Sequence, residues 1–297
     1  MVYYKLLDWI DESKLNLLHL NYNSNSIDYL LDNPDKIKFN YVSLNRNAYH
    51  TIITNKNFDN IEHYMNILIY GSLDFIKMII NDIYDDDWYY LAYNPNAIEL
   101  LEANPDKINW YGLSSNPNAI KLLTENPEKI DWYQLSVNPN AIKLLSENPD
   151  KIYWSRLSYN PNAIQLLTEN PDKIDWYQLS KNPNAIKLLK ENQEEIYWKL
   201  LSSNPNAIEL LEANPEEIDW NYLCRNPNGL KLLEKNQDKI NWDIISRNPG
   251  IFELDYKKMK RKNEEFEEEL IKEVMKPSRI FKYYHTYNCD YLEILFG

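Results

Sequence analysis

The chain has 297 residues, of which 44% are hydrophobic, so it is long and apolar enough to bury a sizeable core. Its formal net charge of −13 argues against a reader of nucleic-acid backbones, because phosphate binding depends on clustered lysine and arginine. Two cysteines, Cys224 and Cys289, are too few for a disulfide framework and fit a reducing compartment. Met1 to Asp11 lacks the pattern of a signal peptide and no run is long enough to span a bilayer, so we expect a cytoplasmic protein without a membrane partner.

Residues 1–87 are expected to hold divergent repeats and an amino-terminal cap. Leu15 to Phe39 and Ser43 to Asn55 are weak copies of a 22-residue pattern that is regular further along the chain, with Asn23 and Asn33 at its asparagine positions. The register slips by five residues near Asn57 to Ile69, which we interpret as a loop insertion or a bend. An Asp85-Asp86-Asp87 run could attract a cation, but consecutive side chains diverge and a turn is the favoured interpretation.

Residues 88–252 form the regular array. An Asn-Pro pair recurs every 22 residues at Asn94, Asn116, Asn138, Asn160, Asn182, Asn204, Asn226 and Asn248. Tryptophan keeps the same spacing at Trp88, Trp110, Trp132, Trp154, Trp176, Trp198, Trp220 and Trp242. Such a period is the signature of a repeat architecture.

One unit, Asn116 to Val137, predicts two short helices. Asn116 and Pro117 suit the start of the first helix, and the second Asn-Pro pair, at Asn126, must end it. Asp131 can cap a second helix that begins at Trp132. Helices this short are unstable alone, so the units must stack, which predicts an all-α protein, an α-solenoid of about ten or eleven helical hairpins.

Two sets of repeated residues have structural interpretations. The tryptophans could form a stacking ladder for bases or sugars, but an apolar residue at one place in every unit favours core packing. The asparagines, represented by Asn116, Asn118 and Asn126, could be a recognition stripe, but helix ends and turns repeat with the backbone and need such residues.

Residues 253–297 contain one long amphipathic helix, Asp255 to Lys276, with Tyr256, Met259, Phe266, Leu270 and Val274 on its apolar side. The terminal units of a solenoid must cover its last open surface. We therefore expect this helix to be the carboxy-terminal cap.

The units NPNAIKLLTENPEKIDWYQLS and the exit SRNPGIFELDYKKMKRKNEEF resemble the NPNAI-type short helical repeat proteins of giant DNA viruses that infect amoebae and algae. The resemblance covers most of the chain. It implies a viral protein made in the cytoplasm of an infected host cell, and it implies no reaction, cofactor or functional residue.

Positions that vary between units are the ones that stacking does not require. The position after each tryptophan and the position before each Asn-Pro pair vary together and lie four residues apart, on one helix side. Their tyrosines form a candidate partner-binding stripe: Tyr89, Tyr93, Tyr111, Tyr133, Tyr159 and Tyr177. Tyrosine is enriched in protein interfaces, although neutral variation of exposed residues is the alternative interpretation.

No motif for a phosphate loop, a catalytic nucleophile or a zinc-binding helix occurs, and the four histidines have no ligand spacing. We therefore expect no enzyme, no cofactor, no metal site and no nucleic-acid partner, and we predict a protein–protein interaction scaffold of unknown partner. Two alternatives remain: an RNA-binding helical-repeat protein, and a structural component of a virus particle or virus factory.

Overall fold

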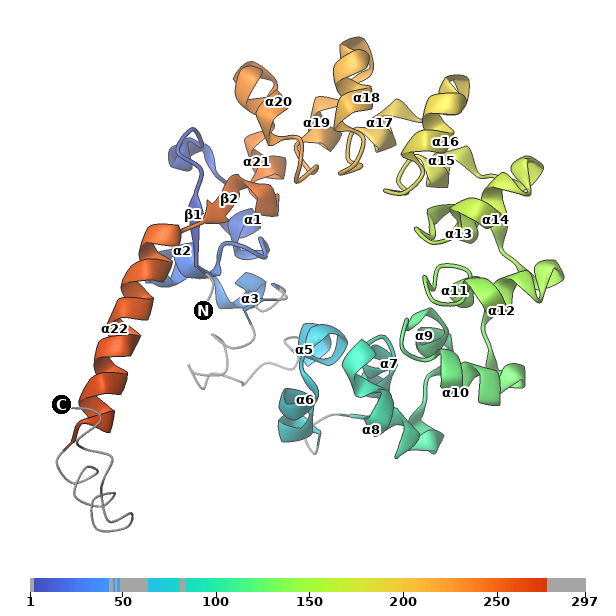
Figure 1. Cartoon of the computed structure of the whole chain (residues 1–297), viewed down its shortest axis with the longest axis horizontal. Coiled ribbons are helices and arrows are strands. Elements are labelled where there is room, and N and C mark those ends of the chain that lie inside the picture. The colour runs from blue at the N-terminus through green and yellow to red at the C-terminus, as the bar shows by residue number, and fades with distance from the viewer. Residues whose placement is uncertain (1–2, 43–44, 46, 49–63, 81–83, 277–297) are drawn as a thin grey trace, which may run out of the picture. The chain divides into compact units, whose positions relative to one another are not determined.

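The computed structural model describes residues 3–42, 45, 47–48, 64–80 and 84–276 (Figure 1). Two compact units contain them: Leu6–Phe252, and Met1–Lys5 with Glu253–Gly297. The chain is mostly helical, with a regular repeating pattern of helices and little sheet, which confirms the predicted all-helical repeat architecture. None of the helices in the described residues combines the length and apolar character needed to cross a membrane.

Each regular repeat contains a first α-helix, a 3-10 turn and a second α-helix that begins at the tryptophan. The first helices are α8 (Ile98–Glu102), α10 (Ile120–Glu125), α12 (Ile142–Ser146), α14 (Ile164–Thr168), α16 (Ile186–Glu191), α18 (Ile208–Ala213) and α20 (Leu230–Lys235). The 3-10 turns are Pro105–Lys107, Pro127–Lys129, Pro149–Lys151, Pro171–Lys173, Gln193–Glu195, Pro215–Glu217 and Gln237–Lys239. The second helices are α7 (Trp88–Leu91), α9 (Trp110–Ser115), α11 (Trp132–Leu135), α13 (Trp154–Tyr159), α15 (Trp176–Leu179), α17 (Trp198–Leu201), α19 (Trp220–Leu223) and α21 (Trp242–Ile245). First and second helices form separate layers in Figure 1.

The helix ends follow from local chemistry. Asp131 caps α11, because its Oδ1 accepts a hydrogen bond from the backbone N–H of Gln134 at 2.8 Å. Helix α10 ends at Glu125, and Asn126, which precedes a proline, leaves the helical conformation with φ −132°. Both features confirm the prediction. The first helix starts later than predicted, at Ile120, because the residues after Asn116 form a turn.

Leucine and alanine, rather than tryptophan, form the fully buried core of the array. Leu157 and Leu167 have no exposed surface, and neither have their equivalents in the neighbouring repeats. Of the eight tryptophans of the regular repeats only Trp88 is buried, and the others are half-buried. The prediction that the repeated tryptophans form the core therefore holds for Trp88 but is wrong for the other seven.

Lysines of the following 3-10 turns lie over the rings of three repeat tryptophans. Lys107 Nζ is 5.5 Å from the centroid of the Trp88 ring. Lys151 Nζ is 4.6 Å from the centroid of the Trp132 ring, and Lys129 Nζ is 5.8 Å from that of Trp110. A leucine three residues along the same helix fills the space between the layers instead.

Buried asparagines join consecutive repeats. The Nδ2 of Asn160 donates to the carbonyl oxygens of Ser136 and Asn138 in the preceding repeat, at 3.1 and 2.9 Å, while its Oδ1 accepts from the backbone N–H of Asn162. The same two donations recur at Asn116, Asn138, Asn182, Asn204, Asn226 and Asn248. We call this set, from Asn94 to Asn248, the asparagine ladder. The prediction that the asparagines satisfy backbone groups is confirmed.

A buried hydroxyl makes a second link between repeats. Ser136 Oγ donates to the carbonyl oxygen of Trp132 at 2.8 Å and accepts the backbone N–H of Tyr153 in the next repeat at 3.1 Å. Cys224 replaces serine in this row, is buried, and its burial raises the pKa of the thiol. The thiol therefore has a structural place rather than a reactive one.

The amino-terminal repeats extend the ladder from the far end of the array. They comprise α1 (Leu17–Asn21), α2 (Ile27–Asp32) and α3 (Phe39–Val42). Asn23 Nδ2 donates to the carbonyl oxygens of Ser246 and Asn248 at 3.1 and 2.8 Å, as each ladder asparagine does to the repeat before it. Asn45 Nδ2 in turn donates to the carbonyl oxygens of Asn21 and Asn23. In stacking order, the amino-terminal repeats therefore come after the last regular repeat.

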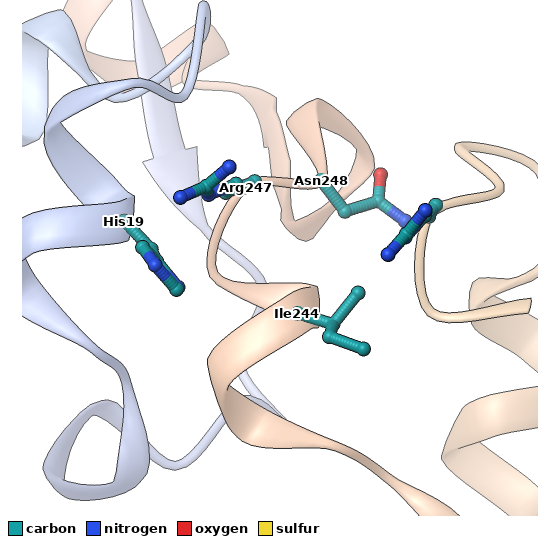
Figure 2. A pocket seen from close by; sticks show the side chains of 5 residues that line it. His19, Ile244, Arg247 and Asn248 are labelled. Carbon is teal, nitrogen blue, oxygen red and sulfur yellow. The ribbon is translucent and has the colours of Figure 1, made fainter. Parts of the chain in front are cut away.

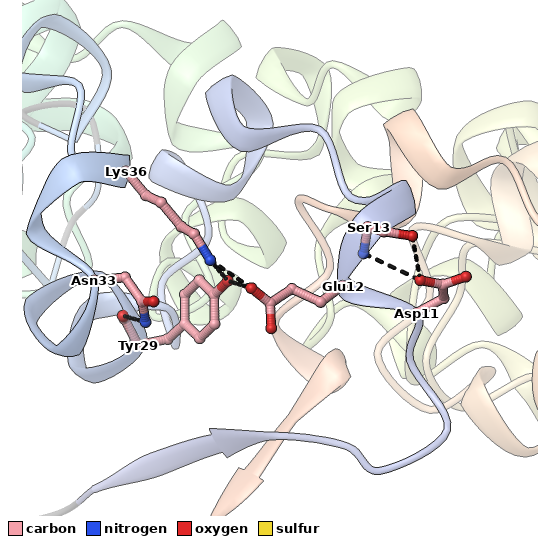
Figure 3. A network of polar contacts seen from close by, with 6 residues as sticks. All are labelled: Asp11, Glu12, Ser13, Tyr29, Asn33 and Lys36. Carbon is pink, nitrogen blue, oxygen red and sulfur yellow. Dashed lines mark hydrogen bonds and ion pairs between the residues drawn. The ribbon is translucent and has the colours of Figure 1, made fainter.

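A network within this terminal region ties α2 to the segment before α1 (Figure 3). The Glu12 carboxylate accepts hydrogen bonds from the Lys36 ammonium and the Tyr29 hydroxyl. The Lys36 ammonium, followed by the Tyr29 hydroxyl, holds the pKa of Glu12 below its ordinary value. These contacts hold α2 and the following turn against the segment before α1.

Helices α5 (Tyr64–Tyr70) and α6 (Leu73–Ile79) meet the first regular repeat. Asn94 Nδ2 donates to the carbonyl oxygens of Leu68 and Gly71 at 2.8 and 3.0 Å, which starts the ladder. Most of the predicted register slip, and the histidines His50, His63 and His285 with Cys289, lie outside the described residues.

The remaining unit contains the long helix α22 (Tyr256–Val274), capped by Asp255, whose Oδ1 accepts from the backbone N–H of Lys258. The two-stranded sheet β1 (Tyr4–Leu6) and β2 (Phe252–Leu254) precedes it. Phe266 and Leu270, on the predicted apolar side of the helix, are 64% and 51% exposed. Within the Leu6–Phe252 unit, the start of α1 and Asn23 contact the last regular repeat, through Asn16 with Asp243 and Asn23 with Ser246.

Candidate functional site

The second-helix layer carries the predicted tyrosine stripe on its solvent side. Tyr89, Tyr111, Tyr133 and Tyr177 each follow the first residue of a second helix, and Tyr159 is the last residue of α13. All five side chains are exposed, at 39% to 49%. Such exposure, repeated at one place in successive repeats, makes them available for contact with a partner.

Tyr93, the sixth predicted residue, differs from the others because it is only half-buried against its neighbours. Its hydroxyl lies 2.9 Å from that of Tyr89, and the two rings are 5.4 Å apart at their centroids. Burial, followed by the hydrogen bond with Tyr89, raises the pKa of Tyr93. Tyr93 therefore supports Tyr89 more than it offers surface of its own.

Two further tyrosines belong to this surface and were missed from the sequence. Tyr153 and Tyr197 precede a tryptophan, are 52% and 50% exposed, and give no side-chain cap to their helices. Their position was assigned to helix capping because most repeats have Asn or Asp there. A tyrosine at a capping position has no such role, and that is the signal that could have identified them.

Tyrosines of consecutive repeats form edge-to-face pairs. The centroids of Tyr133 and Tyr153 are 5.4 Å apart with an interplanar angle of 84°, and those of Tyr177 and Tyr197 are 5.3 Å apart at 80°. Polar pairs occupy the same two positions elsewhere, such as Ser155 Oγ donating to Asp175 Oδ2 at 2.6 Å. We call the surface formed by Tyr89, Tyr111, Tyr133, Tyr153, Tyr159, Tyr177 and Tyr197 the tyrosine face.

Cations lie against these rings. Arg156 Cζ is 4.5 Å from the centroid of Tyr133, and Lys181 Nζ is 4.6 Å from that of Tyr177. Arg156 also donates from a terminal guanidinium nitrogen to Gln134 Oε1 at 3.2 Å. Stacking of this kind fixes the rings and leaves their outer surfaces exposed.

The tyrosine face is hollowed between α15 and α19. A depression of about 450 Å³ is lined by Tyr177, Ile196, Tyr197, Trp198, Lys199, Leu200 and Tyr222. Aromatic side chains and one ammonium group therefore line the same recess, which suits an apolar side chain with a polar tip or a carboxylate beside it.

The acidic run at Asp85–Asp87 forms a 3-10 turn, as predicted, and Lys107 Nζ pairs with Asp85 Oδ1 at 2.7 Å. Over the described parts of the chain, no group of three or more histidine, cysteine, aspartate or glutamate side chains gathers as metal ligands would. The tyrosine face offers a partner aromatic rings with interspersed charges.

No protein-family model, curated protein or solved structure matches this chain.

Proposed function

We propose that the chain is a protein–protein interaction scaffold, an α-solenoid whose tyrosine face binds a segment of a partner protein. The observation that carries the proposal is the row of exposed tyrosines, four of which pair across consecutive repeats. Tyrosine gives a large contact area at a small entropic cost, because it has few rotatable bonds. Pairing reduces that cost further for Tyr133, Tyr153, Tyr177 and Tyr197, since each of these rings is held by its neighbour before a partner arrives.

The charges of this face favour a protein over RNA. In the regular array, four positions of each repeat are counted: the one before the tryptophan and the first, second and fifth after it. Together they hold five cations and five aspartates, so their formal charges cancel. The cations are Arg156, Lys181, Lys199, Arg225 and Arg247, and the aspartates are Asp87, Asp131, Asp175, Asp219 and Asp243. A nucleic-acid backbone needs an excess of cations, which this face lacks.

Selection from a displayed library of random peptides tests the proposal. We expect the wild-type chain to enrich peptides that share a sequence pattern, and the variant Tyr111→Ser/Tyr133→Ser/Tyr177→Ser to enrich none of them. Central interface tyrosines contribute more than ~1 kcal/mol each, so the triple change should weaken a selected peptide at least a hundredfold.

A matched control uses Lys121→Ala/Lys143→Ala/Lys187→Ala, which has the same spacing along the chain. These lysines lie on the first helices, are 79%, 89% and 91% exposed, and have glutamate partners only at 3.9 to 4.0 Å. The control should bind the selected peptides as the wild type does. Equal loss of peptide binding in both variants, or tight salt-sensitive binding of a single-stranded RNA, would contradict the proposal.

A further inference from the structure

A second recess lies where the amino-terminal repeat meets the last regular repeat (Figure 2). It has a volume of about 490 Å³ and is lined by His19, Arg225, Ile244, Arg247 and Asn248. Arg225 and Arg247 hold the same position in consecutive repeats, directly before a ladder asparagine. His19 belongs to α1, so the contact between α1 and α21 completes one wall of this recess.

Both arginines are oriented by aromatic rings and not by acids. Arg225 Cζ is 4.9 Å from the centroid of Tyr222, and Arg247 Cζ is 4.9 Å from that of Tyr22. Within the residues that the structure describes, neither guanidinium forms an ion pair with a carboxylate. Stacking holds each planar group while its N–H edge remains able to donate.

Two aspartates of the same two repeats, Asp219 and Asp243, have other partners. Asp219 Oδ1 caps α19 by accepting from the backbone N–H of Tyr222 at 3.0 Å. Asp243 Oδ1 accepts from Asn16 Nδ2 at 2.6 Å. Among the described residues neither carboxylate forms an ion pair with Arg225 or Arg247.

His19 adds a third polar group with a defined orientation. Its Nδ1 lies 2.8 Å from the carbonyl oxygen of Asp243, and a carbonyl oxygen only accepts, so Nδ1 carries a proton. The other ring nitrogen, Nε2, is an acceptor in the neutral ring and donates to an oxyanion only when the ring is doubly protonated. Ile244 supplies an apolar wall that can contact the carbon stem of a bound side chain.

We propose that this recess binds one oxyanion, a carboxylate or a phosphate, carried by a side chain of the partner protein. Each guanidinium presents a fork of N–H donors that matches two oxygens of such a group, and both arginines line the same recess. The inference rests on the proposed function, because it treats the recess as part of the same partner-binding surface. It adds that the partner segment carries an acidic or phosphorylated residue.

Nuclear magnetic resonance of the arginine Nε–Hε groups tests this inference directly, because the chain has only six arginines. The probes are five-residue peptides with a central glutamate, phosphoserine or glutamine, and inorganic phosphate. We expect the glutamate or the phosphoserine peptide to shift the Arg225 and Arg247 signals and the glutamine peptide to leave them unchanged. The peptide that causes the larger shift identifies the source of the oxyanion, whereas a response to inorganic phosphate alone would overturn the inference.

Charge-removing variants provide the second arm. Arg225→Gln or Arg247→Gln should each weaken binding of the charged peptide roughly tenfold, the effect of losing one charge-assisted hydrogen bond. Lys231→Gln, an exposed cation on α20, should leave it unchanged. Binding that is insensitive to both arginine changes, or absent for every probe, overturns the inference.

The display-selected peptides separate this result from the proposed function. If they bind the wild type through the tyrosines while no oxyanion probe affects the arginines, the inference fails and the scaffold proposal stands. If the oxyanion probes bind while the library yields no peptide, the tyrosine-face proposal fails instead.

Discussion

At the scale of single residues, size and position decide which apolar side chains stabilise the array. A leucine at the third position after the tryptophan is fully buried in every regular repeat from Leu91 to Leu223, whereas seven of the eight repeat tryptophans are half-buried. Sequence periodicity alone cannot separate these two positions, because both recur every 22 residues and both are apolar.

Replacement of one residue of each kind in α13 measures this difference. Leu157→Ala should lower the free energy of unfolding by about 2–5 kcal/mol, because it leaves a cavity in the core. Trp154→Ala should cost less, on the order of 1–2 kcal/mol, because part of the indole is already in contact with water. Urea denaturation of the two variants provides the comparison. If the Trp154→Ala variant is the less stable of the two, Trp154 contributes more to the core than Leu157 and the account is wrong.

The asparagines show a similar contrast within one turn. Asn160 is buried and serves three backbone groups, whereas Asn162 is exposed and donates to the carbonyl oxygen of Pro139 alone. We expect Asn160→Ala to cost about 2–4 kcal/mol and Asn162→Ala less than about 1 kcal/mol, since unmade hydrogen bonds are expensive only where water is excluded. Thermal or urea unfolding measures both variants. If they lose the same free energy of unfolding, the hydrogen bonds of the asparagine ladder stabilise the protein no more than those of an ordinary turn.

At the scale of elements, the sequence predicts the local features well. Three features depend only on neighbouring residues, and the structure agrees with the prediction of each. They are the aspartate cap of α11, the end of α10 before Pro127, and the start of the long helix α22 at Tyr256. The 3-10 turn at Pro127–Lys129 was not predicted. Its proline fixes one backbone angle, but the following Glu128 and Lys129 are neutral with respect to turn and helix.

For the candidate site, five of the six predicted tyrosines are exposed as the stripe requires. Variation between repeats identifies such positions because the backbone and core contacts hold the others constant. The pairing of Tyr133 with Tyr153 could not be predicted, because it depends on how one repeat is rotated against the next.

At the scale of the whole molecule, the contact between α1 and α21 joins residues more than 220 positions apart. No periodic signal reports which repeats are neighbours when they are distant in the chain, so the sequence placed the amino-terminal repeats only at the start of the array. The structure gives them a second role, because they complete the recess that contains Arg225 and Arg247.

Loss of this long-range contact should be visible by hydrogen exchange. The variant Asn16→Ala/Asn23→Ala removes side-chain hydrogen bonds to Asp243, Ser246 and Asn248. Amides of α1 and of α21 should then exchange faster together, while those of α13 remain as in the wild type. Asn33→Ala, which removes a bond to Tyr29 within the same repeat, is the control and should leave α21 protected.

The tyrosine face itself is tested most directly by oxidative footprinting of the chain with and without a display-selected peptide. The account predicts that bound peptide lowers oxidation at Tyr111, Tyr133 and Tyr177, while Tyr84 and Tyr256, which are 62% and 70% exposed elsewhere, react as in the free protein. Protection confined to tyrosines outside the tyrosine face, or no protection at saturating peptide, would contradict it.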